Sequence, residues 1–431
     1  MENRLNKMSI LTFLILTFFA GIFLFVRSFM GIYLFNFRIG ELGVLFCFLL
    51  SGFYVLFLYR KKLIEKKIGI TYLLIIFSFF LVLIISGSSI LDTYTYKASS
   101  YIWTMSFILV GVFVYNNIDF DEIFLKIFGS FLPLIYFLLV LIPENIKQLL
   151  IDFFGTYSDK YEMHKGSDLL IMYLIVFMIN NRKLSKNNLY IYYFVIISSL
   201  YLPLFMFKSR SAFFAALIFI LVEVLRNKKV IFNGNKRTIS LVLLFFVVFN
   251  LSVFFITNSK TLDKDASVVD LISLAESRYQ AYNQDVEMPM FFYRNNRLYS
   301  ADGNLNWRLQ IWQDVFYDMK RSNQTLLFGY GFKDKIPAME KVERTGLDFK
   351  NENVHNNFIN IYARGGLLQL SLFIGFYYFV VTRYKEKFGN FDILIYIIPI
   401  LFCSFFDASM ENSHFPLLYY FFLGRLLIKE Y

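Results

Sequence analysis

Long apolar runs alternate with short polar loops along most of the chain. Runs of roughly 17–25 residues with few charges predict helices that cross a membrane. About twelve such spans are expected, which makes the fold an all-α polytopic membrane protein with a large external loop. The expected spans lie near 8–27, 39–59, 68–87, 100–116, 123–142, 166–180, 188–207, 211–225, 239–257, 356–382, 391–408 and 414–428.

Basic residues gather in four of the connecting loops, and all four loops fall on the same side of a twelve-span arrangement. The positive-inside rule makes that side cytoplasmic, and an even number of spans places both termini there as well. The four groups are Arg60, Lys61, Lys62, Lys66 and Lys67; Arg182, Lys183 and Lys186; Arg226, Lys228, Lys229, Lys236 and Arg237; and Arg383, Lys385 and Lys387.

The longest polar segment then lies outside, so the chain divides into spans 1–9 (1–257), an external loop (258–355) and spans 10–12 (356–431). Two short amphipathic helices are expected in the loop. One opens at Ser267 and runs to about Tyr282. The other starts near Asn306, and its apolar stripe consists of Trp307, Ile311, Trp312, Val315, Phe316 and Met319.

Composition supports this class of protein. The chain has 431 residues, is 57% hydrophobic and only 17% charged, and a soluble domain would carry more surface charge. The net charge of +11 does not indicate nucleic-acid binding, because the basic residues sit in short clusters between spans. Cys47 and Cys403 lie within apolar spans, so no disulfide framework is expected. Phosphate loops and Cys/His metal spacings are missing from the sequence, and we expect no metal and no cofactor.

Arg210 is the first candidate for chemistry. It lies with Lys208 in a short turn between two apolar spans, at the outer membrane boundary. A charge at that depth is costly unless it is paired or faces a polar cavity, which favours a functional role. The alternative is an interfacial anchor whose charged end reaches the lipid headgroups.

Arg308 is the second candidate, in the first turn of the expected external helix and one turn before Trp312. An anion could bind both its guanidinium and the free amides of the helix start. The alternative is an ordinary solvated surface arginine.

His355 is the third candidate. It stands before Asn356, where the chain enters the next span from outside, and a lipid-linked substrate could reach it there. A pKa near neutrality would suit a general base. The alternative is a capping or interfacial histidine. His164 is expected to be solvated, and His414 to pair with Asp407 and Glu411 at the outer surface.

Four short motifs in order resemble those of the O-antigen ligase/polymerase family: an S-R-G turn, an R-x-x-x-W external helix, a G-x-G turn, and H-N followed by paired glycines. Ser211 stands where the family often has glycine, which reduces backbone freedom but keeps a small residue. The matching stretches are Ser209-Arg210-Ser211, Trp307 to Trp312, Gly329-Tyr330-Gly331, and His355-Asn356 with Gly365-Gly366.

The resemblance implies an enzyme that moves a glycan from a polyprenyl-diphosphate carrier to an acceptor hydroxyl, at the outer face of the bacterial cytoplasmic membrane. It implies that Arg210 and Arg308 bind the diphosphate and that His355 serves the acceptor hydroxyl. Lys208, Trp312 and Asn356 would line the substrate site. The implied partners are the lipid-linked glycan, an acceptor glycan or lipid A core, and membrane lipids.

Three functions remain open at this point. The first is a polymerase of surface polysaccharide, and the second is a ligase that attaches the finished glycan to a lipid A core or a protein. These two share the donor and differ in the acceptor. The third is a transporter or flippase, since twelve spans with both ends inside is a common transporter layout. Against it, the polar groups gather on one side instead of at the membrane midplane.

Overall fold

The computed structural model describes most of the chain, and every structural statement below concerns that part. The described residues are 27–34, 37–58, 66–90, 92–117, 133–135, 137–138, 144–158, 165–184, 188–258, 290–341, 344 and 351–428. The predicted first span at 8–27 and the loop helix from Ser267 to Tyr282 lie almost wholly outside these residues. The same holds for most of the predicted 123–142 span and for His164.

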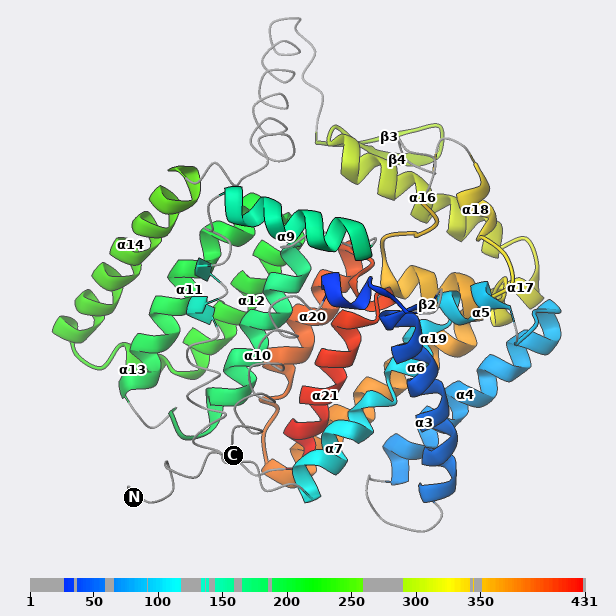
Figure 1. Ribbon diagram of the computed structural model, residues 1–431, viewed down its shortest axis with the longest axis horizontal. Helices are drawn as coiled ribbons and strands as arrows, with labels where there is room; N and C mark the ends of the chain where they lie inside the picture. The colour runs from blue at the N-terminus through cyan, green and yellow to red at the C-terminus, as the bar shows by residue number, and fades with distance from the viewer. Residues whose placement is uncertain are drawn as a thin grey trace, which may run out of the picture.

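The described chain is mostly helical, with two small two-stranded sheets that the sequence pattern did not predict (Figure 1). In order the elements are β1 (Tyr33–Leu34), β2 (Phe37–Arg38), α3 (Ile39–Leu58), α4 (Lys66–Ser86), α5 (Thr93–Ala98), α6 (Ser100–Thr104), α7 (Phe107–Asn117), α9 (Glu144–Tyr157), α10 (Gly166–Leu184), α11 (Asn188–Lys208), α12 (Arg210–Arg226), α13 (Lys228–Ile231), α14 (Asn235–Asn258), β3 (Phe291–Arg294), β4 (Arg297–Ser300), α16 (Gly303–Met319), α17 (Asn323–Phe328), α18 (Pro337–Glu340), α19 (Asn357–Phe388), α20 (Leu394–Phe406), the 3₁₀ helix η2 (Ser409–Glu411) and α21 (His414–Ile428).

Four helices of the described part are long and apolar enough to cross a membrane, which makes this an integral membrane protein. They contain Lys67–Ser86, Leu189–Lys208, Asn235–Thr257 and Asn357–Phe388. Shorter apolar helices cover Ile39–Phe53, Ser100–Phe113, Gly166–Ile179, Leu394–Phe406 and His414–Ile428. The predicted count of about twelve spans is therefore not confirmed.

The segment predicted as one span at 100–116 is divided into α6 and α7. Two hydroxyl side chains there bond to backbone carbonyls: Thr104 to Ser100 at 3.0 Å, and Ser106 to both Trp103 at 2.7 Å and Cys47 at 3.1 Å. Such bonds compete with the regular helical ladder and locally bend it. The hydropathy pattern does not reveal such a bend, because a few Ser and Thr residues lower the mean hydropathy of the segment only slightly.

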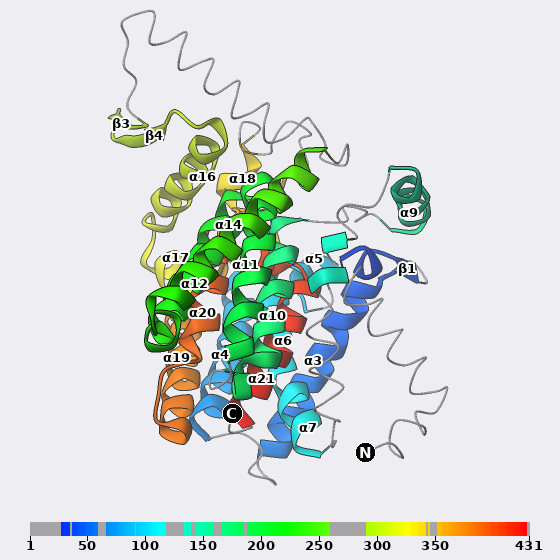
Figure 2. The same cartoon turned by 90° about the vertical axis from the view of Figure 1, so that its left-hand side faces the viewer.

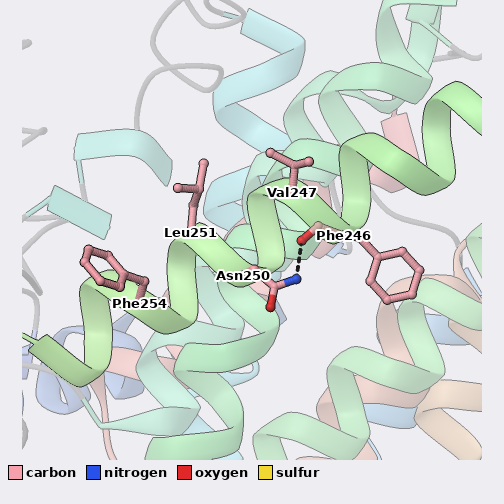
Figure 3. A pocket seen from close by; sticks show the side chains of 5 residues that line it. All are labelled: Phe246, Val247, Asn250, Leu251 and Phe254. Carbon is pink, nitrogen blue, oxygen red and sulfur yellow. Dashed lines mark hydrogen bonds between the residues drawn. The ribbon is translucent and has the colours of Figure 1, made fainter.

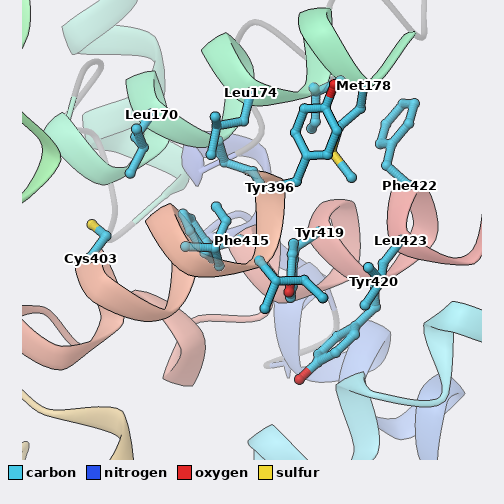
Figure 4. Packing of buried hydrophobic residues seen from close by; sticks show 14 of the residues in the cluster. Leu170, Leu174, Met178, Tyr396, Cys403, Phe415, Tyr419, Tyr420, Phe422 and Leu423 are labelled. Atoms are coloured by element: carbon cyan, nitrogen blue, oxygen red, sulfur yellow. The ribbon is translucent and has the colours of Figure 1, made fainter. Parts of the chain in front are cut away.

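A continuous apolar core joins the central helices (Figure 4). Leu170, Leu174 and Met178 of α10 face Tyr396 of α20 and Phe415 of α21 in this core, and all five side chains belong to one cluster. Where α7 crosses α21 the backbones approach closely. A Cβ atom at Gly111 would meet the backbone of Phe421, and one at Gly424 would meet that of Ile108. Small residues at such crossings are the usual way for membrane helices to pack.

The helices run between two ends of the molecule, and the loops meet at those ends. Arg226, which ends α12, forms an ion pair of 2.6 Å with Asp392 in the loop before α20. Two of the predicted cytoplasmic loops therefore meet at one end. At the other end α16, α18 and the β3–β4 hairpin lie over the bundle, as Figures 1 and 2 show.

The predicted second loop helix is present as α16, but it begins at Gly303 instead of Asn306. Asp302 is its N-cap, because its carboxylate accepts a hydrogen bond of 2.9 Å from the amide of Leu305. The preceding β3–β4 hairpin turns at Asn295 and Asn296, whose φ angles are 50° and 58°. Two consecutive positive φ angles define a type I′ turn, and Asn tolerates them well. The Asn-Asn pair was thus a readable signal that the span analysis passed over.

Ion pairs bind the hairpin and the following loop to α16. The buried carboxylate of Asp314 contacts Arg297 of β4 at 2.5 Å, Arg344 at 2.9 Å and Lys341 at 3.2 Å. Burial acts to raise the pKa of Asp314, but Arg344 and Arg297 hold it below its usual range. The described part of the predicted external loop is therefore an ordered cap and not a loose connector.

Candidate active site

Arg210 is the first residue of α12, directly after its N-cap Ser209. Its guanidinium forms an ion pair with Asp302, the N-cap of α16. The side chain of Arg210 remains 57% exposed, whereas that of Asp302 is only 5% exposed. The contact links the turn between α11 and α12 to α16, and it leaves much of the guanidinium accessible.

Arg308 lies in the second turn of α16 and not in the first, because the helix starts earlier than predicted. The amide of Leu305 is bonded to the Asp302 carboxylate and that of Asn306 to the Asp302 carbonyl at 2.7 Å. One of the helix-start amides predicted to bind an anion, that of Leu305, is therefore already occupied by Asp302, and for the other amides the prediction stays a prediction. Arg308 instead donates to the carbonyl oxygen of Phe406, at the end of α20, over 2.6 Å.

The surroundings of Arg308 are strongly charged. Burial lowers the pKa of its guanidinium, Asp407 and Asp302 act to raise it, and Arg210 acts to lower it. These influences place Arg210, Asp302, Arg308 and Asp407 close enough to one another to interact. Among the described residues the guanidinium Nε of Arg308 is buried and has no hydrogen-bond partner. A buried donor of this kind is suited to an incoming acceptor.

His355 occupies the turn before α19, with a φ of 52°. Its Nε2 lies 3.2 Å from the Oδ1 of Asn351, and its ring centroid lies 5.2 Å from that of Trp307. Burial and the nearby Arg308 lower the pKa of His355 to about 4, against the effect of Asp407. The prediction of a pKa near neutrality is therefore wrong. The physical reason is that this imidazole is buried beside cations.

Asp407 and Lys165 complete the cluster, and the sequence analysis missed both as site residues. Lys165, just before α10, forms an ion pair of 2.9 Å with Asp407, just after α20. Burial acts to raise the pKa of the Asp407 carboxyl. The charges of Lys165 and His355 and a hydrogen bond from Ser167 keep it below its usual range. Lys165 and Asp407 are far apart in the sequence and no local motif links them. Only the packing of α10 against α20 brings them together.

His414 does not pair with Asp407 and Glu411 as predicted. It is buried at the start of α21, and its Nε2 lies 2.8 Å from the Oδ1 of Asp168 in α10. The sequence reasoning chose the nearest acids along the chain, whereas the packing of α21 against α10 selects Asp168.

The other predicted substrate residues have structural contacts. Trp312 is 7% exposed, and its indole N–H donates to the carbonyl of Val354 at 2.8 Å. Asn356 is fully buried and caps α19 by accepting from the amide of Ile359 at 3.1 Å. Both therefore hold the segment around His355 in place. Lys208 is half-buried in the last turn of α11, two residues before Arg210.

The Gly329-Tyr330-Gly331 stretch and the glycine pair of α19 form one structural unit. Gly366 interrupts α19 with a φ of 67°. The amides of Tyr330 and Gly331 donate to the carbonyls of Ala363 at 2.8 Å and Arg364 at 3.0 Å. These bonds satisfy carbonyl groups near the helix break. A carbonyl left without a hydrogen-bond donor close to the membrane would destabilise the fold. The two motifs thus fix the helix that begins two residues after His355.

The cluster of Arg210, Arg308, Lys165, His355, Asp302 and Asp407 is called the outer charge cluster below, after the side of the membrane that the sequence predicts for it. Its three permanent cations outnumber its two carboxylates, and the net positive charge favours an anion such as a diphosphate. Among the residues that the structure describes, no three His, Cys, Asp or Glu side chains gather as metal ligands. A positioned imidazole beside such cations can serve acid–base chemistry at a phosphorylated leaving group.

A shallow groove on α14 lies apart from this cluster (Figure 3). Its lining consists of Phe246, Val247, Asn250, Leu251 and Phe254, all from one helix. Asn250, its one polar residue, donates to the carbonyl of Phe246 at 2.7 Å. The lining contains no charged group, so the groove offers no counter-charge to an anion.

Comparison with known proteins agrees with the resemblance noted from the motifs. Residues 193–374 match the family model described as O-antigen ligase. The matched stretch runs from α11 into α19 and includes Arg210, Arg308 and His355. A search of curated proteins found no match. Members of the matched family are enzymes that act on glycans in the synthesis of surface polysaccharides. The chain is an integral membrane protein whose residues 193–374 match the O-antigen ligase family.

Proposed function

We propose that this protein transfers a glycan from a polyprenyl-diphosphate carrier to an acceptor hydroxyl, on the outer face of the bacterial cytoplasmic membrane. Polymerisation of surface polysaccharide is the form that we place first, and ligation to a lipid A core or a protein is the alternative. The observation that carries the proposal is the meeting of Arg210, Arg308 and His355, from three distant parts of the chain, in one cluster.

The two arginines are assigned to the diphosphate. Arg210 and Arg308 lie on different elements, and each is held by an internal acceptor: the Asp302 carboxylate and the Phe406 carbonyl. A diphosphate offers both of them stronger acceptors with a fork geometry that guanidinium groups match. As the glycosidic C–O bond breaks, negative charge grows on the leaving oxygen, and the same donors stabilise it.

His355 is assigned to the acceptor hydroxyl, and its hydrogen bonds identify the reactive nitrogen. The Oδ1 of Asn351 already accepts from the amide of Asn353 at 3.2 Å, so it is an acceptor for His355 as well. The proton of the neutral ring therefore sits on Nε2. The lone pair is left on Nδ1, which is buried and has no partner among the described residues. Nδ1 is thus the atom that would take the hydroxyl proton.

In the proposed step the acceptor hydroxyl displaces the diphosphate from the donor sugar. The acceptor oxygen bonds to the anomeric carbon, its proton passes to His355 Nδ1, and the bond from that carbon to the diphosphate oxygen breaks. The electron pair leaves with the diphosphate. Asp407 stabilises the imidazolium that forms, since it interacts with His355 and acts to raise its pKa. A bound diphosphate acts in the same direction, so the base gains strength when the donor is present.

Glycan transfer in proteoliposomes tests this proposal. Purified wild type and the variants Arg210→Ala, Arg308→Ala and His355→Ala receive polyprenyl-diphosphate-linked repeat units. The matched control is Arg321→Ala, whose side chain is 77% exposed at the end of α16. A positioned base contributes ~10²–10⁴ in rate, so His355→Ala should lose at least about 100-fold, while Arg321→Ala stays near wild type.

The acceptor requirement separates the alternatives. A ladder of longer lipid-linked glycans supports the polymerase. Transfer that needs an added lipid A core or protein supports the ligase. If wild type forms no glycosidic bond with any acceptor but moves labelled lipid across the bilayer, the enzyme proposal is wrong and the transporter reading replaces it.

A further inference from the structure

The three tryptophans of the chain are not equivalent. The indole N–H of Trp103 donates to the hydroxyl of Ser99 at 2.9 Å, and that of Trp312 donates to the carbonyl of Val354 at 2.8 Å. Trp307 is half-buried, and its N–H is shielded from solvent but has no hydrogen-bond partner among the described residues. Since a buried indole N–H usually finds an acceptor, this donor is available for one that arrives with a substrate.

Trp307 also borders the outer charge cluster. It precedes Arg308 on α16, and consecutive residues of a helix point about 100° apart. Nevertheless both residues meet His355: the Trp307 ring by contact at 5.2 Å between centroids, and Arg308 through its charge. His355 therefore lies near both the Trp307 ring and Arg308, the cation that we assign to the diphosphate. A group bonded directly to the diphosphate would enter the same space.

We infer that Trp307 is the binding surface for the sugar ring of the donor that is bonded to the diphosphate. The inference rests on the proposed function and adds a saccharide subsite to it. A pyranose ring has one face of C–H groups, which suit the electron-rich face of an indole, and a rim of hydroxyls, which can accept from its N–H. Trp312, which was predicted to line the substrate site, is less suited to this role, because its ring is buried and its N–H is already bonded.

A binding experiment with two lipids tests the assignment. The probes are lipid-linked repeat units, taken from cells of the source strain that lack this protein, and polyprenyl diphosphate without sugar. The variants are Trp307→Ala and Trp307→Phe. Arg308→Ala is the comparison for the diphosphate, and Tyr317→Ala, 60% exposed on the same helix, is the matched control. Thermal unfolding in detergent confirms that each variant is folded.

Trp307→Ala should weaken binding of the sugar-bearing lipid about tenfold and leave binding of the bare lipid within about twofold. Trp307→Phe keeps an aromatic face but lacks the N–H, so its loss should be about threefold. Arg308→Ala should weaken both lipids. Trp103 and Trp312 are buried, so the change in fluorescence on adding the sugar-bearing lipid should disappear in Trp307→Phe.

The outcomes separate the two claims. Equal losses for both lipids in Trp307→Ala, or no loss for either, would show that Trp307 only packs against His355, and the saccharide subsite would be wrong while the diphosphate site stands. If wild type binds neither lipid, the proposed function itself fails, and the subsite fails with it.

Discussion

Each cation of the outer charge cluster is held by an internal oxygen in this structure. Arg210 is paired with Asp302, Lys165 with Asp407, and Arg308 with the carbonyl of Phe406. Carboxylates among the cations reduce their mutual repulsion and keep them in place when no substrate is bound. The same carboxylates would compete with the proposed diphosphate, so its affinity would depend on how easily the arginine and lysine exchange one acceptor for another.

Asp302→Asn should tighten donor binding. Asn remains a good N-cap for α16, so the free energy of unfolding should change by less than ~1 kcal/mol, whereas Arg210 loses a competing anion. The expected result is a KM for the lipid-linked donor that falls about threefold or more. Steady-state kinetics in proteoliposomes measure it. Asp302→Ala should instead lose about 1 kcal/mol through the lost cap. An unchanged or higher KM in Asp302→Asn would contradict a competitive role for Asp302.

The pH dependence of transfer should reflect the buried state of His355. Its pKa is lowered from 6.5 to about 4 in the free protein, so the basic form persists as the pH falls towards 4. The acid limb of kcat/KM, which reports the free enzyme, should therefore lie near pH 4. The limb of kcat should lie higher, because a bound diphosphate favours the imidazolium. A kcat/KM limb centred near 6.5 would show that His355 is not shielded as the structure has it.

At the scale of elements, the break in α19 decides how the chain enters the membrane after His355. The first part of the helix, from Asn357 to Gly365, is capped by Asn356. Gly366 adopts a left-handed φ, and a Cβ there would meet the backbone of Leu327 and Phe328 at the end of α17. The helix break at Gly366 packs directly against the end of α17, and the turn at Gly329 and Gly331 bonds to the same part of α19. A change in one of these segments should therefore disturb the others.

Gly366→Ala should destabilise the protein, because the substituted residue would need both a left-handed backbone and space that α17 occupies. The expected loss is about 1–3 kcal/mol, seen as a lower Tm in detergent. Gly375→Ala on the same helix is the matched control, since its Cβ would meet only Thr71 Cγ2 at 4.0 Å. Alanine also favours helix there, so this variant should keep or raise the Tm. Similar Tm values for both variants would contradict the proposed role of the break.

At the scale of the whole molecule, a shared apolar cluster and several polar contacts join the cap to the helix bundle. The packing of Trp312 against Phe405 and Phe406 attaches α16 to α20. Lys97 of α5 pairs with Glu352 at 2.7 Å, and Lys335 pairs with the same carboxylate at 3.3 Å. Because the outer charge cluster lies where cap and bundle meet, disturbing the cap should affect the site without unfolding the bundle.

Asp314→Asn should loosen the cap selectively. Asp314 is 4% exposed and contacts three cations, and removing one partner of a buried ion pair costs about 3–5 kcal/mol. Limited proteolysis should then cleave within 290–341 faster than in wild type, while the membrane helices resist. The control Glu386→Gln breaks only a solvent-exposed pair with Arg383 and should leave cleavage unchanged. Cleavage at the wild-type rate in Asp314→Asn would mean that the ion pairs do not hold the cap.

The sequence by itself determined the class of protein and the identity of the three candidate residues. Long apolar runs indicate membrane helices. A helix satisfies its backbone N–H and C=O groups within its own segment, so this feature depends only on the local sequence. Four short motifs in order were enough to find Arg210, Arg308 and His355. Turn conformations also depend on the local sequence. Glycine at 329 and 331 permits the positive φ angles found there. The Asn295-Asn296 pair is a local signal for the hairpin, although the hairpin was not predicted.

Only the tertiary structure decided which groups surround those residues. Lys165 and Asp407 are 242 residues apart and meet because α10 and α20 share a core, a fact that no local pattern contains. The pKa of His355, the pairing of His414 with Asp168, and the contrast between Trp307 and Trp312 depend in the same way on burial and on neighbours distant in sequence. Burial and charge act through space, so the properties of the site follow from packing, whereas the helices themselves follow from the local pattern.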